Sequence, residues 1–255
     1  MEIFGILNVT PDSFSDGGNF ISLDKAKTQV QKIISEGATI IDVGGESTRP
    51  GAEFVDEQTE IERVVPVIAM IKANFDVEVS IDTYKSPVAK AAIEAGATII
   101  NDVKANRYDG KMLELVKMYN VKYVAMHSRK SEHPLADMKA LFTEILAAAN
   151  NLQIDLNLII LDPGIGFNKD TEQNLKIMNN LKSLKAQFQA NQFLLGTSRK
   201  RFIGAVNHVE AADQRIIGTT VTTVVGFQAG FEYVRVHDVL ANKQAIEMIA
   251  AIDKS

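Results

Sequence analysis

Residues 36–43 read Glu36-Gly37-Ala38-Thr39-Ile40-Ile41-Asp42-Val43, and this stretch decides the fold because it occurs again along the chain. A close copy is Ala95-Gly96-Ala97-Thr98-Ile99-Ile100-Asn101-Asp102-Val103, and a looser copy is Ala229-Gly230-Phe231-Glu232-Tyr233-Val234-Arg235-Val236. Glycine suits the left-handed position that stops a helix, and a short apolar run is typical of a parallel strand buried on both faces. The repeat therefore predicts a helix end followed by a buried strand.

Eight apolar runs of this kind are spread along the 255 residues. They lie at Ile3–Val9, Thr39–Val43, Glu78–Ile81, Thr98–Ile100, Tyr123–Met126, Leu158–Leu161, Phe193–Gly196 and Tyr233–Val236. Stretches with helical periodicity follow them, at Leu23–Ser35, Glu57–Ala73, Pro87–Ala95, Lys111–Tyr119, Asp137–Leu152, Thr171–Lys185, Asp213–Ala229 and Val239–Ile252. This alternation predicts an α/β fold, a (β/α)8 TIM barrel in which residues 1–255 form a single domain. The alternative is an open doubly wound sheet, but its GxGxxG fingerprint after the first strand is missing.

Composition narrows the possible functions. The chain has no cysteine, which excludes disulfides, thiolate metal sites and cysteine nucleophiles. Its net charge is -5 without an extended basic patch, so we expect no nucleic-acid partner. The N-terminus does not resemble an export signal, because Glu2 stands where positive charge is expected. Apolar runs such as Val64–Ile71 are far too short to span a membrane. We expect a cytoplasmic protein without a membrane partner.

Polar residues follow nearly every predicted strand, which is where barrels place their chemistry. In chain order they are Asn8, Asp42, Asp82, Asn101, Asp102, His127, Asp162, Ser198, Arg199, Lys200, Arg235, His237 and Asp238. Each one alone could be a loop or helix cap, but together they indicate a site, and we expect no such series on the opposite rim. The mixture suits a neutral heterocycle that carries donors, acceptors and an anionic group. A tight zinc site is not expected, whereas Mg²⁺ held partly through phosphate is compatible with these residues.

Two long loops contain glycine, proline and charges. They span Thr10–Asn19 and Gly44–Ala52. They are either plain surface loops or lids that close on substrate and supply Asp16 and Arg49. Asp42 either orients the second loop or touches the substrate, and we favour a structural role for Asp102. His133 and His208 are expected to be solvated loop histidines.

The motifs at the strand ends resemble those of dihydropteroate synthases. The resemblance is strongest in Asn8–Gly18 (NVTPDSFSDGG) and Asp42–Gly51 (DVGGESTRPG). It continues in order through Ser80–Thr83, Ile100–Val103, Leu161–Phe167, Ser198–Lys200 and Arg235–Asp238. The sequence departs from the family at Lys104–Asp109 and Ser128–His133, both in loops that follow predicted strands. These departures leave the expected activity intact. The family pattern does not predict the detailed structure of these two loops.

The resemblance implies a role for each matching position. Pterin recognition would fall to Asp82, Asn101, Asp162 and Lys200, with Met126 and Phe167 packed near the ring. Diphosphate would meet Asn8, Arg235 and His237, with Mg²⁺ bound through Asn8. The p-aminobenzoate site would use Thr48, Pro50, Phe167, Lys200 and Arg201. The catalytic residues would be Asp16, Arg49, Lys200, Arg235 and His237.

The resemblance also implies the reaction. A pterin diphosphate would lose diphosphate first, and p-aminobenzoate would attack the resulting pterin cation to give dihydropteroate for folate synthesis. It further implies a homodimer that sulfonamides inhibit. Three alternatives differ in class: a corrinoid-dependent methyltransferase, a silent pterin-binding homologue and an unrelated sugar-phosphate barrel enzyme. The first would not be expected to carry both loop motifs, and the second would be expected to lack Asn8, Asp16, Arg49 or Lys200.

Overall fold

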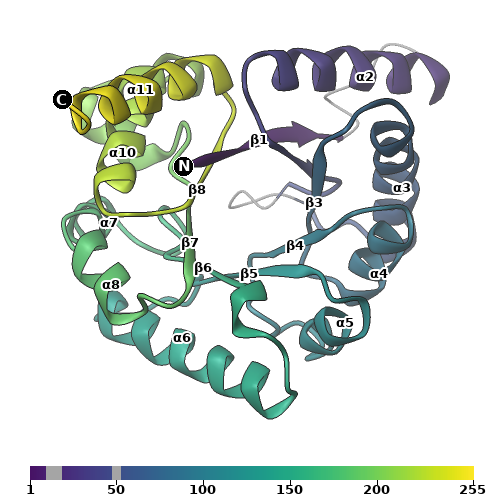
Figure 1. Cartoon of the computed structure of the whole chain (residues 1–255), viewed down its shortest axis with the longest axis horizontal. Coiled ribbons are helices and arrows are strands. Elements are labelled where there is room, and N and C mark those ends of the chain that lie inside the picture. The colour runs from purple at the N-terminus through teal and green to yellow at the C-terminus, as the bar shows by residue number, and fades with distance from the viewer. Residues whose placement is uncertain (10–18, 48–52) are drawn as a thin grey trace.

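The computed structural model describes residues 1–9, 19–47 and 53–255, and these form the predicted closed barrel (Figure 1). The strands are β1 Glu2–Asn8, β2 Ile40–Gly44, β3 Glu78–Asp82, β4 Ile99–Asp102, β5 Lys122–Met126, β6 Ile159–Asp162, β7 Gln192–Leu195 and β8 Tyr233–Val236. They pair in chain order, all parallel, and β1 closes on β8. The open-sheet alternative is therefore wrong.

Helices surround the strands on the outside (Figure 1). They are α2 Asn19–Ser35, α3 Glu57–Asn74, α4 Ser86–Glu94, α5 Met112–Tyr119, α6 Pro134–Asn151, α7 Thr171–Met178, α8 Leu181–Gln187, α9 Arg201–Asn207, α10 Ile216–Gln228 and α11 Val239–Ile252, with short 3₁₀ turns at Leu156–Leu158 and Ala212–Arg215. The single helix predicted at Thr171–Lys185 is two helices, because α7 ends at Met178 and α8 begins at Leu181. No helix in the described ranges is long and apolar enough to cross a membrane.

The glycines of the repeat stop helices as predicted. Gly37, Gly96 and Gly230 have φ angles of 106°, 116° and 84°, which is the left-handed region where a Cβ is unfavourable. Each stands between the end of a helix and the start of the next strand. The repeated sequence is therefore the connection between the helix of one barrel unit and the strand of the next.

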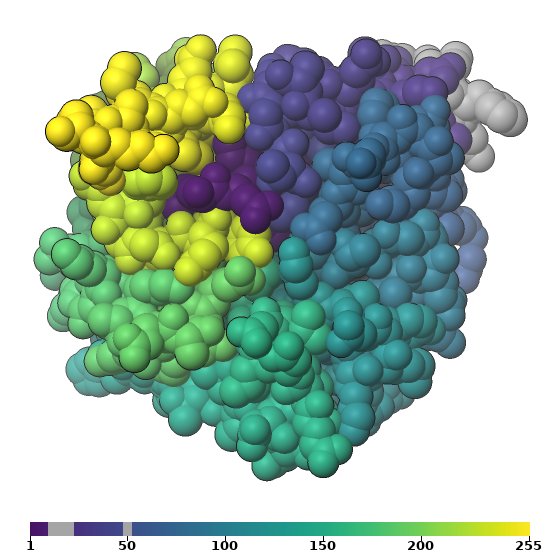
Figure 2. All heavy atoms as spheres, in the orientation of Figure 1, coloured from purple at the N-terminus to yellow at the C-terminus, as the bar shows by residue number. Residues whose placement is uncertain are grey.

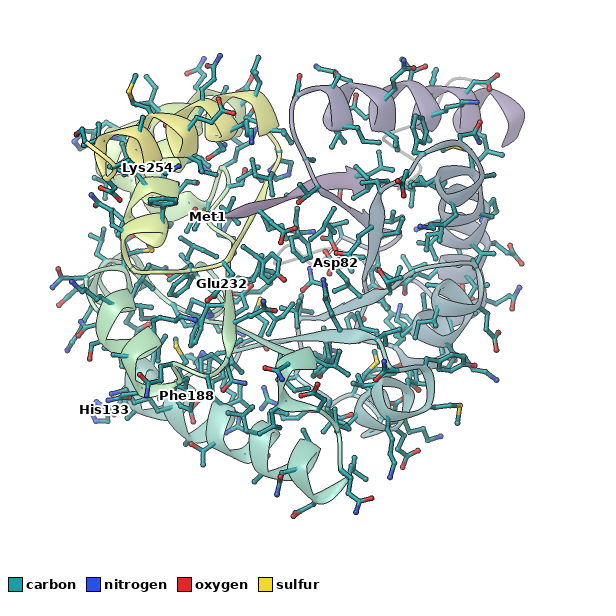
Figure 3. The ribbon with its side chains drawn as sticks, in the orientation of Figure 1. Met1, Asp82, His133, Phe188, Glu232 and Lys254 are labelled. Atoms are coloured by element: carbon teal, nitrogen blue, oxygen red, sulfur yellow. The ribbon has the colours of Figure 1, made fainter. Side chains whose placement is uncertain are left out.

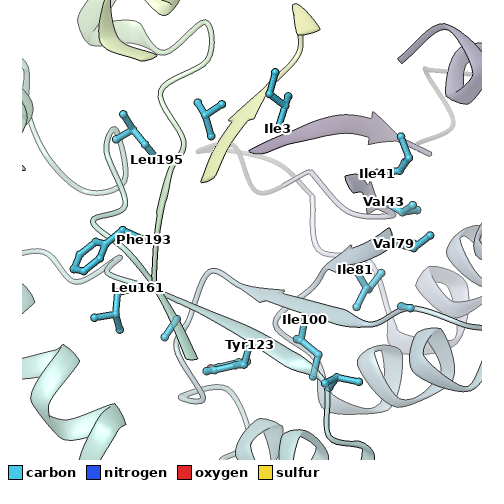
Figure 4. Close-up of a cluster of buried hydrophobic side chains, with 14 of the residues drawn as sticks. Ile3, Ile41, Val43, Val79, Ile81, Ile100, Tyr123, Leu161, Phe193 and Leu195 are labelled. Atoms are coloured by element: carbon cyan, nitrogen blue, oxygen red, sulfur yellow. The ribbon is translucent and has the colours of Figure 1, made fainter. Parts of the chain in front are cut away.

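Side chains alternate between the two faces of the barrel wall, as the two-residue period of a strand requires. The outward set, which includes Ile3, Ile41, Val79, Ile100 and Phe193, packs in one large apolar cluster together with the helices (Figure 4). The inward set forms a separate cluster, the inner floor, made of Phe4, Ile40, Ile99, Val124, Ile160, Leu194 and Tyr233. Two positions further along four of these strands stand Asp42, Asn101, Asp162 and Arg235. The same alternation therefore places these polar residues inside the barrel, directly above the inner floor.

The opposite rim differs from our expectation, because the strand starts also carry polar residues. Lys122 Nζ lies 3.0 Å from Glu78 Oε2, and Lys185 Nζ lies 2.5 Å from Glu232 Oε1. Tyr233 donates from its hydroxyl to Gln192 Oε1 at 3.2 Å. Figure 2 shows the face on which the chain begins, with atoms of the N-terminal residues, in purple, at its middle. These groups bind one another across the strand starts, so this rim is closed by paired charges.

Candidate active site

Arg235 is the centre of the polar layer above the inner floor. Its Nε donates to Asp42 Oδ2 at 2.5 Å, and its Nη2 donates to Asp82 Oδ2 at 2.6 Å. Asn101 Nδ2 lies 3.3 Å from Asp42 Oδ2. Asp82, from the end of β3, points into the middle of the barrel (Figure 3). Asp42 is fully buried, and it orients Arg235 and Asn101. The two roles considered from sequence, orienting the second loop or touching the substrate, did not include this contact with Arg235.

Asp82 has an acceptor left over. Within the described part of the chain, its Oδ1 is buried and has no hydrogen-bond partner. Burial raises the pKa of Asp82 to about 7, against the opposing attraction of the Arg235 guanidinium. Buried acceptors are normally satisfied. An N–H donor on a ligand would satisfy this oxygen and favour the ionised carboxylate.

Asp162 and Lys200 form the other half of the layer. Asp162 is buried at the end of β6, and its Oδ1 accepts from Gly164 N at 2.7 Å. Lys200 Nζ donates to the carbonyl of Ile165 and lies 4.4 Å from the ring centroid of Phe167. Burial raises the pKa of Asp162, with Lys200 opposing the change. Burial also lowers the pKa of Lys200 to about 7, against the attraction of Asp162. The charge of Lys200 therefore depends on Asp162.

The loop after β6 is held by a lysine that sequence reasoning missed. Lys169 Nζ donates to three backbone carbonyls, those of His127 at 3.0 Å, Gly164 at 2.9 Å and Phe167 at 3.0 Å. Burial lowers the pKa of Lys169 to about 8. A lysine in a polar loop has no sequence pattern that distinguishes it from a solvated one. Its contacts fix the loop that shapes the Asp162 and Phe167 side of the site.

The predicted diphosphate residues lie at the neighbouring strand ends. Asn8 is exposed at the end of β1, and its Oδ1 and Asp82 Oδ2 both border Gly44. The backbone N–H of His237, just after β8, donates to Ser198 Oγ at 3.1 Å, and the ring Nδ1 of His237 lies 2.9 Å from the same hydroxyl. A groove of about 670 Å³ starts here and runs between α2 and α11. Asn8 and His237 therefore share one open edge of the site.

The remaining predicted residues divide into three groups. Thr48, Arg49, Pro50 and Asp16 lie outside the described residues. Met126 is buried at the end of β5 and faces the interior, whereas Arg201 is exposed at the start of α9. His133, at the periphery in Figure 3, and His208 are exposed, as expected.

Two rim residues serve the structure. Asp102 accepts from Lys104 N at 2.7 Å, Asn106 N at 2.6 Å and the Tyr123 hydroxyl at 2.8 Å, so the structural role favoured for it is confirmed. His127 Nε2 lies 2.8 Å from Asp137 Oδ2 on α6. Burial lowers the pKa of His127 to about 4, so this ring is neutral at neutral pH. Neither side chain belongs to the layer around Arg235.

A metal site made of protein ligands alone is not found in the described ranges, because no three His, Cys, Asp or Glu side chains gather suitably. Asn8 supplies one hard amide oxygen at the open edge, and a carboxylate oxygen of Asp82 borders the same glycine, Gly44. Such a donor set fits Mg²⁺, which keeps several waters and takes substrate phosphate as a ligand. The residues present are therefore compatible with Mg²⁺ only when a phosphate ligand accompanies it.

Comparison with known proteins identifies the class. The sequence pattern of the family described as "Pterin binding enzyme" matches residues 4–237, and the chain belongs to this family. It is 49% identical over 254 residues to the dihydropteroate synthase of Clostridium beijerinckii, with 96% of this chain and 92% of that protein covered.

Solved structures agree with this assignment. A crystal structure of the Clostridium difficile dihydropteroate synthase in the presence of pteroic acid superposes with a TM-score of 0.94 at 43% identity, covering 100% of this chain and 97% of that one. The Xanthomonas albilineans dihydropteroate synthase with 4-aminobenzoic acid gives 0.93 at 38% identity, covering 99% and 93%. A Yersinia pestis dihydropteroate synthase in a sulfonamide drug complex gives 0.90 at 35% identity, covering 99% and 94%.

Proposed function

We propose that the chain is a dihydropteroate synthase, which joins 6-hydroxymethyl-7,8-dihydropterin diphosphate to p-aminobenzoate in folate biosynthesis. The observation that carries the proposal is the polar layer above the inner floor, in which buried Asp82, Asn101 and Asp162 lie together with the partly buried cations Lys200 and Arg235. Relatives with this name share the fold and nearly half of the sequence. No specific observation favours the corrinoid methyltransferase, the silent homologue or the sugar-phosphate enzyme.

The layer suits the polar edge of a pterin. A pterin amino group and ring N–H form a two-donor edge, and Asp162 offers Oδ2 together with the second lone pair of Oδ1. The unpartnered Asp82 Oδ1 provides a further acceptor. Lys200 supplies a donor for the acceptor-bearing side of the ring, and Phe167 lies against Lys200. These contacts would bind and orient the ring while the inner floor stops it from sinking further.

The charges in the layer favour a cationic pterin. When Asp82 is ionised, Asp42 and Asp82 together outweigh the single charge of Arg235, so these three groups then carry a net negative charge. In the proposed reaction the bond between the pterin methylene carbon and the diphosphate oxygen breaks, and the electron pair leaves with diphosphate. The neutral aryl amine then donates its lone pair to the methylene carbon and loses a proton to water. Carboxylates fixed beside the ring would lower the energy of the cation that forms between these steps.

Diphosphate would be held at the open edge of the site. Arg235 is already flanked by two carboxylates, which offset much of its charge before diphosphate arrives. His237 and the amide of Asn8 are the other candidates for this contact. We propose that Asn8 also holds Mg²⁺ together with the diphosphate oxygens. When bound, this ion supplies charge neutralisation for the leaving group.

A homodimer forms part of the proposal. One face of α10 exposes Ile217, Val221 and Val225 at intervals of four residues, with exposed fractions of 79%, 58% and 37%. Leu240 of the neighbouring α11 is also exposed. A contiguous apolar face of this kind usually marks a protein contact. It supports a second copy of the chain as the partner, while sulfonamide sensitivity and cytoplasmic location stay predictions.

The decisive assay mixes the purified chain with dihydropterin diphosphate, p-aminobenzoate and Mg²⁺. We expect dihydropteroate and diphosphate to appear in equal amounts, and we expect a chelator to stop turnover. Omitting p-aminobenzoate controls for simple hydrolysis of the diphosphate. Tight pterin binding with no dihydropteroate formed would refute the proposed reaction and favour the silent homologue.

A further inference from the structure

Two neighbouring loops at the mouth of the barrel carry residues assigned to different parts of the substrate. Lys200 follows β7 and belongs to the proposed pterin contacts, whereas His237 follows β8 and belongs to the proposed diphosphate contacts. The ladder between β7 and β8 ends with the pair formed by Leu195 and Val234. Backbone pairing therefore stops before either loop begins and does not set the relation between the two loops.

Arg199 and Asp238 join these loops through a two-point ion pair. Arg199 Nε donates to Asp238 Oδ2 at 2.9 Å, and Arg199 Nη2 donates to Asp238 Oδ1 at 2.6 Å. The two side chains are 29% and 15% exposed, so solvent screens the pair only in part. Two parallel bonds between a guanidinium and a carboxylate fix the orientation of the groups as well as their distance. The pair therefore holds the loop after β7 and the loop after β8 in one arrangement.

A second contact lies beside this ion pair. The Ser198 hydroxyl accepts from the backbone N–H of His237 at 3.1 Å and lies 2.9 Å from the ring Nδ1 of the same residue. Consecutive residues of the first loop, Ser198 and Arg199, thus bind consecutive residues of the second loop, His237 and Asp238. Because the two contacts are adjacent in both loops, a shift of Asp238 would also shift the His237 ring.

The backbone of Arg199 is held in a conformation that residues with a Cβ seldom adopt. Its φ of 58° lies in the left-handed region. Its N–H donates to Thr219 Oγ1 at 3.0 Å, and its carbonyl accepts from Arg215 Nη1 at 3.0 Å. Such a conformation persists where several surrounding contacts determine it. Arg199 is thus anchored near α10 through its backbone and to Asp238, at the start of α11, through its side chain.

The same turn sends two neighbouring side chains to opposite sides of β7. Lys200 donates to the Ile165 carbonyl in the loop after β6. Arg199 instead reaches Asp238 in the loop after β8. Strand β7 lies between β6 and β8 in the barrel. One short turn therefore connects the Lys200 side of the polar layer to the open edge where His237 lies.

We propose that Arg199 and Asp238 are positioning residues that hold the diphosphate end of the substrate in register with its pterin ring. This inference rests on the proposed function. The bond that breaks lies between the pterin methylene carbon and the diphosphate oxygen, so the leaving group has to be aligned while the ring stays in the polar layer. The ion pair acts on this alignment through His237 and Lys200. It should therefore affect turnover and leave binding of the ring unchanged.

The test replaces Asp238 with asparagine, which keeps the size of the side chain but turns one of its two acceptors into a donor. We expect Asp238→Asn to lower kcat about tenfold, the typical effect of losing one charge-assisted hydrogen bond. The Kd of 6-hydroxymethyl-7,8-dihydropterin, which lacks the diphosphate, should stay unchanged in calorimetry. Arg199→Lys keeps the charge but loses the two-point geometry, so it should show the same pattern and carries the test if Asp238→Asn does not fold.

Three results with a folded variant would overturn the inference. The first is an unchanged kcat, and the second is a loss of dihydropterin affinity that parallels the loss of kcat. The third is a higher kcat in Asp238→Asn, because it would show that Asp238 restrains Arg199 from binding diphosphate directly.

A double-mutant cycle separates positioning from a general structural effect. If Asp238 acts through His237, Asp238→Asn should have little further effect on kcat once His237 is replaced by alanine, whereas additive losses would overturn the inference. Glu232→Gln is the matched control, because Glu232 Oε1 pairs with Lys185 Nζ at 2.5 Å on the opposite rim. This control should keep the kcat of the unsubstituted chain.

A second measurement does not require turnover. Hydrogen exchange of the His237 amide, which donates to Ser198, should become faster in Asp238→Asn. Exchange of the Phe193 amide, which donates to Glu232 Oε2 at 2.8 Å, should stay the same. Unchanged exchange at His237 would refute the coupling of the two contacts. Absence of dihydropteroate from the unsubstituted chain would instead refute the proposed function, so the two failures can be told apart.

Discussion

Replacing Asp162 with asparagine tests the pterin edge directly. Asp162 is buried, and its Oδ1 is engaged with Gly164 N at 2.7 Å. In Asp162→Asn the amide oxygen would keep this backbone bond, and the new NH₂ group would then face the two donors of the pterin edge. The substitution keeps the size of the side chain but turns two attractive contacts into a clash of donors.

The size of the effect follows from these contacts. Each charge-assisted hydrogen bond is worth about 1.5–3 kcal/mol, so two of them correspond to a roughly 10²- to 10⁴-fold loss of pterin affinity. Lys200 would add to this loss. Burial already lowers the pKa of Lys200 to about 7, and Asp162 is the first group that opposes this change. Without Asp162 the pKa of Lys200 would fall further, and more of the amine would be neutral at pH 7.

Calorimetry with dihydropterin diphosphate and steady-state turnover measure the two consequences, and circular dichroism checks that the barrel persists. Asp102→Asn is the matched control, because Asp102 is equally buried but binds Lys104, Asn106 and Tyr123 outside the polar layer. Its pterin affinity should be unchanged. Near-normal pterin affinity in a folded Asp162→Asn protein would refute the assignment of this edge.

Four further predictions follow from the site and the helices. Asp82, with a pKa of about 7, takes up a proton as pH falls, and Lys200, also with a pKa of about 7, loses one as pH rises. The profile of kcat/KM against pH should therefore be a narrow bell near pH 7. A flat profile from pH 6 to 8 would contradict this. Gly166 has a φ of 83°, and a Cβ there would lie 2.7 Å from Lys200 Cδ. Gly166→Ala should therefore lower the free energy of unfolding in urea by about 1–2 kcal/mol and weaken pterin binding. Unchanged pterin affinity would show that Lys200 can move freely. Arg49→Ala, outside the described residues, should lower turnover much more than pterin affinity, and equal losses would argue against its catalytic role. Ile217→Asp should convert the proposed dimer to monomer in light scattering after gel filtration, and an unaltered mass would place the interface elsewhere.

The fold could be predicted because its signals are local. Each repeat glycine stops a helix, and each apolar run is short and β-prone, so the eight units can be counted without knowing any tertiary contact. The division of Thr171–Lys185 into α7 and α8 was missed because helical periodicity continues through Asn179 and Asn180. Helix α9 was missed because its seven residues are too few to show a clear period.

The site could be predicted only as a set of positions. The parallel topology and the two-residue period place Asp82, Asn101 and Asp162 inside one mouth, which the structure confirms for the described residues. The pairing of Arg235 with Asp42 joins residues 193 positions apart, and no local pattern reports it. The same holds for Lys169, whose three acceptors are backbone carbonyls that exist at every position in the sequence.

The inner floor has a consequence for the fate of a reactive intermediate. Its seven apolar side chains lie beneath the polar layer, and charged pairs lie beyond them at the strand starts. As far as the described residues go, the floor therefore leaves the mouth as the route by which water would reach a pterin bound as proposed. An incoming p-aminobenzoate that occupies this mouth would shield the cation from hydrolysis. The same molecule would then act as the nucleophile and exclude water from the cation.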